Sequence, residues 1–252
     1  MGELFKISKK DFDKFLNKIK DMHELYAPVR TDALRYEKIK DINAINLETL
    51  PDFPIKEFFF RNREKLFSFK GNEINVNIED AQKRVFFGVR RCDLNAIAHQ
   101  DFMFMEKHQD PYYIAQRKNS ILIGYHCNVA PTKYCFCGSM DLKDYYDMMI
   151  WDKGEYYLID AKSDNAKLMM NSDFEKTSIK LTEELKKIEF TDKLKNRNIE
   201  KLFENPGWRT GSEKCISCAA CTTLCPTSYC HEIKDEVTLA DLKQGDRIRE
   251  WS

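Results

Sequence analysis

The chain has 252 residues, in which 41 lysines and arginines balance 41 aspartates and glutamates. This length suffices for one large domain or two modest ones, each with its own core. The balanced charge favours neither nucleic acid nor an anionic membrane surface, so we expect no partner of either kind. The longest uninterrupted apolar runs, such as Met148 to Trp151, are far too short to span a bilayer. Since the first residues do not resemble a secretory signal either, we expect a cytoplasmic protein.

The first predicted element is an amphipathic helix that begins after Ser8 and ends before Pro28. Ser8 and Asp11 have the spacing of a capping box, in which the serine side chain receives a hydrogen bond at the start of the helix. The apolar stripe at helical spacing consists of Phe12, Phe15, Leu16, Ile19 and Met22.

Two short apolar runs, Val85 to Val89 and Ile121 to Tyr125, predict buried strands. Between them, Asp93 to Met105 can form a helix. The side chains expected on one face of this helix are Leu94, Ile97, Ala98 and Phe102. Further along, Tyr145 to Trp151 and Tyr156 to Ile159 flank a turn and predict a β-hairpin.

The character of the chain changes from about residue 165, where short helical patterns replace strand-like runs. We therefore place a domain boundary near residue 175. The expected fold class is α+β: residues 1–175 form a mixed α/β domain with cysteines in its strand-end loops. Residues 176–252 form a small, mainly helical, ferredoxin-like module.

The module contains a run of cysteines with two-residue and three-residue gaps, followed directly by Pro226. Its members are Cys215, Cys218, Cys221 and Cys225. This spacing is that of the bacterial ferredoxin run, whose thiolates hold a 4Fe-4S cluster. Zinc knuckles usually separate two cysteine pairs by a longer loop, and buried structural cysteines have no reason to recur every third residue. The run thus predicts electron transfer, with a zinc-stabilised interaction module as the alternative from another class.

A second set of cysteines lies near the ends of the two predicted strands and in the loop beyond them. It consists of Cys92, Cys127, Cys135 and Cys137. Loops at the ends of neighbouring strands are where α/β scaffolds place functional groups, so the four thiols could meet in a metal site. Ordinary packing of cysteines explains the same pattern equally well. His126 could add a ligand or simply be hydrogen-bonded, and Asp93 could cap the following helix.

Several of these motifs together resemble a known family. They are Gly88 to Ile97, Asp110 to Tyr113, Gly124 to Cys127, Cys135 to Met140, Cys215 to Pro226 and Gly245 to Trp251. In this order they are similar to a family of ferredoxin-type iron–sulfur subunits. The family includes the iron–sulfur subunit of anaerobic sulfite reductase and the beta subunit of cytoplasmic sulfhydrogenases. The resemblance extends from about residue 85 to the end of the chain.

The resemblance implies a non-catalytic subunit that relays electrons from a flavin-bearing subunit to a catalytic one. It also implies that Cys92, Cys127, Cys135 and Cys137 ligate a second 4Fe-4S cluster. The amino-acid sequence around Asp93 and within the ferredoxin run favours the sulfite reductase branch. The alternative is the beta subunit of a NiFe sulfhydrogenase. The chain contains neither a dinucleotide nor a P-loop glycine pattern, so we expect no nicotinamide oxidation by this chain alone.

One departure concerns a second ferredoxin run, which family members carry beyond the position of Ser252. Its absence is expected either in a shortened product or in a natural single-run variant. Because the fourth cysteine of a run ligates the other cluster in two-cluster ferredoxins, Cys225 is the least secure ligand of its set. Cys230 is either a substitute ligand or a spare thiol.

Overall fold

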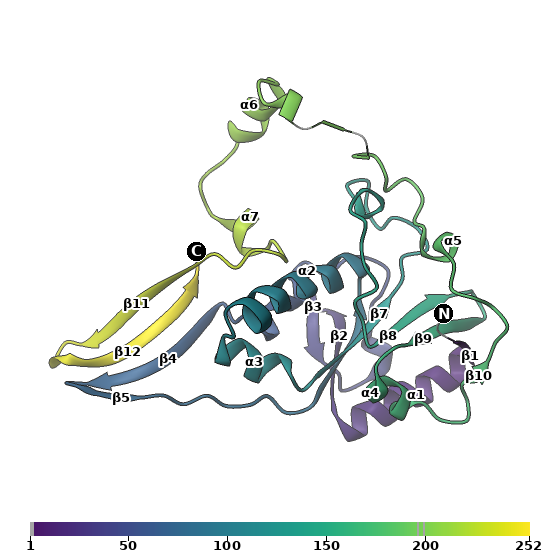
Figure 1. The fold of residues 1–252 in the computed structure, drawn as a ribbon, viewed down its shortest axis with the longest axis horizontal. Helices are drawn as coiled ribbons and strands as arrows, with labels where there is room; N and C mark the ends of the chain where they lie inside the picture. The colour runs from purple at the N-terminus through teal and green to yellow at the C-terminus, as the bar shows by residue number, and fades with distance from the viewer. Residues whose placement is uncertain (1–2, 196, 199) are drawn as a thin grey trace.

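The computed structural model describes residues 3–195, 197–198 and 200–252. Figure 1 shows a sheet flanked by helices, an arm that arches away from it, and a long twisted hairpin that projects to one side. In the described residues, the strands of the larger sheet are β1 (Leu4–Ser8), β2 (Glu24–Arg30), β3 (Leu34–Lys38), β6 (Arg84–Val89), β7 (Ser120–Tyr125), β8 (Met148–Asp152), β9 (Tyr156–Ala161) and β10 (Glu175–Lys176).

The larger sheet is mixed, with the order β10-β1-β9-β8-β7-β6-β2-β3. Its centre is parallel, because β2, β6, β7 and β8 pair side by side in the same direction. The outer strands β3, β9, β1 and β10 are antiparallel to their neighbours. The predicted hairpin is confirmed as β8 and β9, and the expected mixed α/β architecture is confirmed with them.

Helices cover both faces of this sheet. The helical segments are α1 (Lys9–Met22), η1 (Ile42–Ala44), η2 (Ile55–Phe58), α2 (Arg91–Asp101), η3 (Phe102–Lys107), α3 (Pro111–Arg117), η4 (Cys137–Ser139), α4 (Asp164–Met169), α5 (Glu183–Lys186), η5 (Glu200–Leu202), α6 (Gly207–Ser212) and α7 (Ala220–Thr223). In Figure 1, α2 and α3 lie along one side of the sheet, and α1 and α4 lie along the other.

Successive side chains of the central strands point to opposite faces and build two apolar layers. Val85 and Phe87 of β6 pack with the stripe of α1, whereas Phe86 packs with Leu94 and Ile97 of α2. The α1 cap is the predicted one, because the Ser8 hydroxyl accepts a hydrogen bond from the amide of Asp11 at 3.1 Å. Burial on both faces explains why the parallel strands are continuous apolar runs.

The helix expected from Asp93 to Met105 differs in its second half. After Asp101 the backbone widens into the π-helical segment η3, which shifts the positions of the following side chains. Phe102, expected on the buried face, is 43% exposed, and Phe104 is buried in its place. The prediction for Phe102 was wrong because it assumed an unbroken 3.6-residue period.

A second sheet joins strands from residues 63–75 to strands from residues 231–251. Its strands are β4 (Arg63–Lys70), β5 (Glu73–Asn75), β11 (His231–Thr238) and β12 (Asp241–Trp251), in the order β11-β12-β4-β5. All neighbours in it are antiparallel. Residues 231–251 therefore form a hairpin, and the helical character predicted for the C-terminal module is not confirmed. Ile233 and Val237 are four residues apart, a spacing that fits one face of a strand and also one face of a helix. The domain boundary near residue 175 stays a prediction.

A buried ion-pair group fixes β12 to the rest of the molecule. Arg249, only 4% exposed, donates to Glu64 of β4 at 2.5 Å and also to Asp110. Asp110 in turn caps α3, accepting hydrogen bonds from the amides of Tyr112 and Tyr113. The last strand is thereby linked to both β4 and α3.

Candidate metal centres

The strand-end cysteines lie at the carboxyl edge of the parallel core. Strands β6 and β7 are parallel neighbours, so their ends meet at one edge of the sheet. Cys92 lies in the first turn of α2, directly after β6, and Cys127 lies two residues after β7. Cys135 and Cys137 follow in the next loop, with Cys137 at the start of η4. All four side chains are partly buried.

A bulge at the end of β6 directs the chain toward Cys92. The pairing of β6 with β7 shifts register between Phe87 and Val89. Gly88 lies between them at φ +83°, a left-handed conformation that glycine adopts without strain. The bulge precedes Arg90, which is only 3% exposed.

The Arg90 guanidinium lies against the thiol of Cys127. Its Nη1 is 3.7 Å from Cys127 Sγ, and its Nη2 donates to the carbonyl of Leu47. The same guanidinium stacks over the Tyr125 ring, with its carbon 5.1 Å from the ring centroid. Arg90 was missed in the sequence, although the Arg-Arg-Cys order after a predicted strand was visible there.

The thiols act on one another electrostatically. Burial raises the pKa of Cys92 well above its usual range, and negative charges on Asp93, Cys127 and Cys137 raise it further. Burial likewise raises the pKa of Cys127, Arg90 opposes this, and charges on Cys137 and Cys135 add to it. The four thiols therefore share one neighbourhood, where thiolates need a compensating cation. Iron bound to thiolates supplies such a charge.

Four thiols are thus chemically suitable ligands for an iron–sulfur cluster, but their side chains are not close enough to one another to hold one. Among residues 3–195, 197–198 and 200–252, no three His, Cys, Asp or Glu side chains are grouped closely enough to hold a metal ion. Ligation by Cys92, Cys127, Cys135 and Cys137 accordingly stays a prediction.

The polar neighbours of these thiols have other roles. His126 is 3% exposed and packs beside Trp151, with ring centroids 5.8 Å apart. Burial lowers its pKa to about 4, and the positive charges of Arg91 and Lys153 lower it as well, so the imidazole is neutral at pH 7. Asp93 does not cap α2, because Arg90 occupies the N-cap position and its side chain makes no capping hydrogen bond. Burial raises the pKa of Asp93 to about 6.

The loop that contains Cys135 and Cys137 is held in place by Thr191. The amide of Gly138 donates to the hydroxyl of Thr191 at 3.1 Å, and the Ser139 hydroxyl donates to the Thr191 carbonyl at 3.3 Å. Thr191 itself is fully buried. A cavity of about 620 Å³ adjoins this contact and includes Arg91 and Cys137 in its lining.

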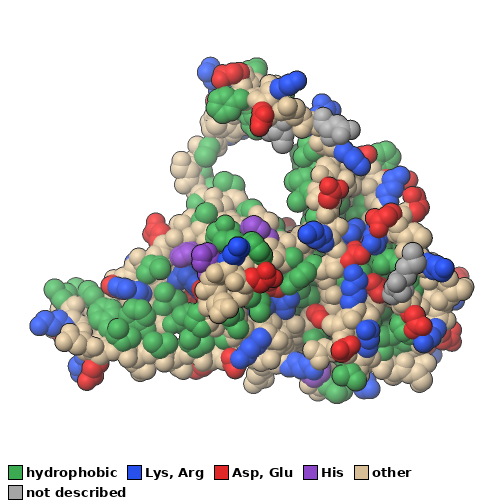
Figure 2. Space-filling model, viewed as in Figure 1, with side chains coloured by type: hydrophobic (Ala, Val, Ile, Leu, Met, Phe, Trp, Pro, Cys, Tyr) green, Lys and Arg blue, Asp and Glu red, His purple; other side chains and the backbone are tan. Residues whose placement is uncertain are grey.

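The ferredoxin run begins in an arm, which we define as residues 188–195, 197–198 and 200–224, and ends at Cys225 directly after it. Figures 1 and 2 show this arm arching over α2, with open space beneath it. Cys215, Cys218 and Cys221 are exposed, and Cys225 is partly buried. The large apolar side chains that the arm leaves exposed are Phe190, Leu194, Leu202, Phe203, Trp208, Ile216 and Leu224.

The backbone of the run contains two residues in a left-handed conformation. Ser217 and Ala219 have φ values of +56° and +58°, in the left-handed region that is unfavourable for residues with a side chain. The amide of Ser217 donates a hydrogen bond to Cys215 Sγ at 3.4 Å. Backbone conformations of this cost cluster at ligand-binding segments, which agrees with the cluster predicted here.

Cys225 lies among hydrogen-bond donors that favour its thiolate. Burial alone would raise its pKa, but hydrogen bonds from the Thr227 hydroxyl and from the amides of Thr227 and Ser228 lower it overall. The Thr227 hydroxyl is 3.2 Å from the sulfur, and the charge of Lys56 contributes in the same direction. Cys230 is exposed, and its role stays open.

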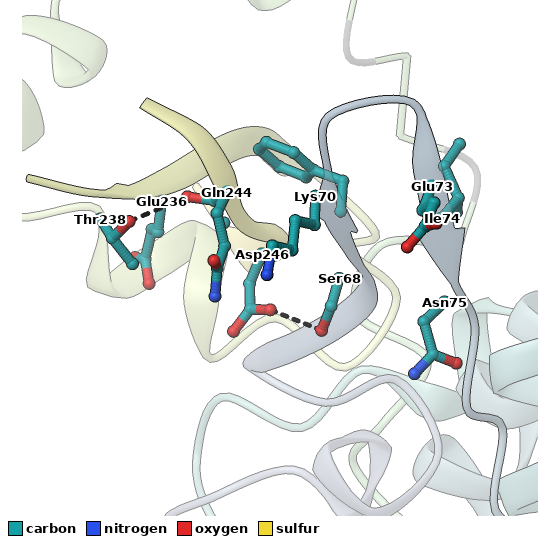
Figure 3. Close-up of a pocket in the computed structure, with 11 residues that line it drawn as sticks. Ser68, Lys70, Glu73, Ile74, Asn75, Glu236, Thr238, Gln244 and Asp246 are labelled. Atoms are coloured by element: carbon teal, nitrogen blue, oxygen red, sulfur yellow. Dashed lines mark hydrogen bonds between the residues drawn. The ribbon is translucent and has the colours of Figure 1, made fainter. Parts of the chain in front are cut away.

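A further pocket is lined by no cysteine. Figure 3 shows it on the second sheet, between the β4–β5 turn and the hairpin of β11 and β12. Its volume is about 660 Å³, and its lining includes Lys70, Glu73 and Asp246. The Ser68 hydroxyl donates to Asp246 at 2.6 Å, so this carboxylate is already partnered. We assign no chemistry to this pocket.

Comparisons with known proteins agree with the cysteine chemistry. Residues 214–252 match the family model of a 4Fe-4S dicluster domain. The chain is 29% identical over 248 residues to sulfhydrogenase 2 subunit beta of Pyrococcus furiosus, covering 91% of this chain and 73% of that protein. The chain is thus similar to an iron–sulfur subunit of this kind over most of its length. No solved structure matches it.

These matches confirm the family resemblance and support at least one 4Fe-4S cluster in this iron–sulfur protein. The preference for the sulfite reductase branch is not confirmed, and the sulfhydrogenase alternative fits the related protein better. Among the described residues, no helix has the length and apolar character needed to cross a bilayer.

Proposed function

We propose that this chain is the electron-transfer subunit of a cytoplasmic, hydrogenase-type complex. It carries one 4Fe-4S cluster on Cys215, Cys218, Cys221 and Cys225 and a second on Cys92, Cys127, Cys135 and Cys137. A flavin-bearing subunit supplies the electrons, which then pass to a catalytic subunit. The similarity to a sulfhydrogenase beta subunit supports the choice of complex.

The main support for the proposal is that the two cysteine sets lie near opposite ends of α2. Cys92 lies in the first turn of this helix, beside the other strand-end thiols. Gln100, in its last turn, donates to the carbonyl of Pro226, the residue after Cys225. Eight positions along a helix correspond to about 12 Å. This short separation along one helix supports the proposal that electrons pass between a cluster at each set.

Iron and inorganic sulfide content test the proposal. The chain prepared without oxygen should contain about eight iron atoms if both sets hold cubanes, and it should be brown. A colourless chain that binds stoichiometric zinc and no iron would instead indicate the zinc-stabilised interaction module.

Cysteine variants then separate the two sites. Cys127→Ser and Cys135→Ser should each remove about four iron atoms and leave the run occupied, because distant sites with separate ligands couple weakly. Iron content and low-temperature spin-resonance signals measure this. Unchanged values in both variants would reduce the strand-end set to structural cysteines.

A further inference from the structure

The segment that follows the ferredoxin run is bound to the body of the molecule by two side chains. Gln100 Nε2 donates to the carbonyl of Pro226 at 3.0 Å, and Lys56 Nζ donates to the carbonyl of Ser228 at 3.0 Å. Gln100 is fully buried and Lys56 is 1% exposed. We call Gln100 and Lys56 the exit clamp, because they hold the chain where it leaves the run.

Aromatic side chains add to the contact between this segment and the body of the molecule. The Tyr229 ring lies 5.8 Å from that of His99 and 6.0 Å from that of Phe104, between centroids. Cys225 is thus attached to a segment that contacts α2 and η3, whereas the arm that precedes it is largely exposed. Of the four thiols in the run, Cys225 alone is partly buried.

Lys56 places a positive charge beside this end of the run. Its ammonium lies 4.2 Å from the centroid of the Trp251 ring. Within the part of the chain that the structure describes, no carboxylate lies within salt-bridge distance of Lys56. Burial lowers the pKa of Lys56, whereas negative charge on Cys225 and Cys230 raises it. The hydrogen bond to Ser228, three residues after Cys225, places this buried cation next to the end of the run.

We propose that Gln100 and Lys56 are positioning residues for the cluster of the ferredoxin run, and that the Lys56 ammonium makes this cluster easier to reduce. The inference rests on the proposed function. Reduction adds one electron, and hence one negative charge, to a thiolate-bound cluster. A cation buried nearby stabilises that charge more than solvent-screened cations do. Neither residue needs to touch the iron.

Four variants of the full chain test the proposal. Lys56→Met removes the charge and one hydrogen bond, Lys56→Arg keeps the charge, and Gln100→Leu removes the other hydrogen bond only. Lys14→Met is the matched control, because this exposed lysine of α1 lies on the opposite face of the sheet and pairs only with Asp11 among the described residues.

The first measurement uses the metal-free chain, so that it does not depend on a cluster. Chymotrypsin should cleave after Tyr229 several-fold faster in Lys56→Met and Gln100→Leu than in the wild type, with Lys14→Met unchanged. Wild-type cleavage rates in both clamp variants would refute the clamp.

The second measurement is a redox titration of the iron-loaded chains with dithionite, followed by spin resonance. Lys56→Met should lower the reduction equilibrium constant about tenfold, which is about 59 mV for one electron, whereas Lys56→Arg and Lys14→Met should keep the wild-type potential. Equal potentials in Lys56→Met and the wild type, at equal iron content, would refute the role of the charge. A wild-type run that binds no iron would refute the proposed function instead, and the cleavage assay would still decide the clamp.

Discussion

At the scale of single residues, Gly88 shapes the approach to Cys92. Its φ of +83° lies where β6 changes register against β7, two residues before Arg90. A Cβ at this position would lie 2.5 Å from Leu47 Cδ2 and 3.2 Å from Pro28 Cδ. The leucine tip can move, but the proline ring of β2 cannot move readily. Leu47 also accepts a hydrogen bond from Arg90 through its carbonyl, so the bulge and the thiol environment are connected.

We therefore expect Gly88→Ala to destabilise the fold by about 2–4 kcal/mol, from left-handed strain and overpacking together. Gly154→Ala is the matched control, since Gly154 has φ +85° and nothing within 4 Å of the added Cβ. It should cost about 1 kcal/mol, from strain alone. Urea unfolding of both variants measures the difference. Equal losses would show that the contacts with Leu47 and Pro28 do not restrict this position.

At the scale of elements, β12 connects the C-terminal part to the body. It pairs with β4 along seven residue pairs, and Arg249 lies buried between Glu64 and Asp110. Such a group gains little over apolar packing when intact, but removing one partner leaves buried charges unpaired. The position of the exit clamp depends on this strand, because Trp251 lies under Lys56.

Arg249→Met should accordingly destabilise the molecule by about 3–5 kcal/mol, because the buried Glu64 and the partly buried Asp110 lose their cation. Arg247→Met provides the control on the same strand. Arg247 pairs with Asp235 at 2.7 Å, but both side chains are solvent-exposed, so its loss should change the unfolding midpoint little. Denaturant unfolding followed by tryptophan fluorescence compares the two. Similar midpoints would mean that β12 is not held by the buried group.

At the scale of the whole molecule, the arm presents an exposed apolar surface. The arm exposes a series of large apolar side chains beside the ferredoxin run, including Phe203 at 81% and Ile216 at 83%. Exposed apolar side chains grouped in this way are typical of surfaces that meet another protein. The related protein is named as part of a sulfhydrogenase, which agrees with this interpretation.

We expect the tagged chain, purified from its native host without oxygen, to carry two partners, one containing nickel and the other a flavin. That complex should reduce viologen dyes with hydrogen, and it should reduce them with NAD(P)H through the flavin. The isolated chain should do neither, because it has no nucleotide-binding glycine pattern. Metal analysis and dye assays measure this. Sirohaem and sulfite-dependent dye oxidation in place of nickel would return the chain to the sulfite reductase branch.

The sequence by itself determined the features that depend on near neighbours in the chain. The ferredoxin run, the capped helix α1, the β8–β9 hairpin and the strands β6 and β7 all follow from local spacing. It also indicated that Cys92 and Cys127 belong to one sheet edge, because cysteines follow two apolar strands. The mainly helical character expected for residues 176–252 is not confirmed, because residues 231–251 form a hairpin that pairs with the distant strand β4.

The tertiary structure alone decided the contacts between distant parts of the chain. Lys56 and Ser228 are 172 residues apart, and Gln100 and Pro226 are 126 apart, yet each pair forms a hydrogen bond. No local pattern marks a buried lysine or glutamine as a partner for one particular carbonyl. The π-helical turn that exposes Phe102 and the pairing of β4 with β12 depend in the same way on packing and register between distant segments. Local spacing fixes which atoms can bind a cluster, and long-range packing fixes what surrounds it.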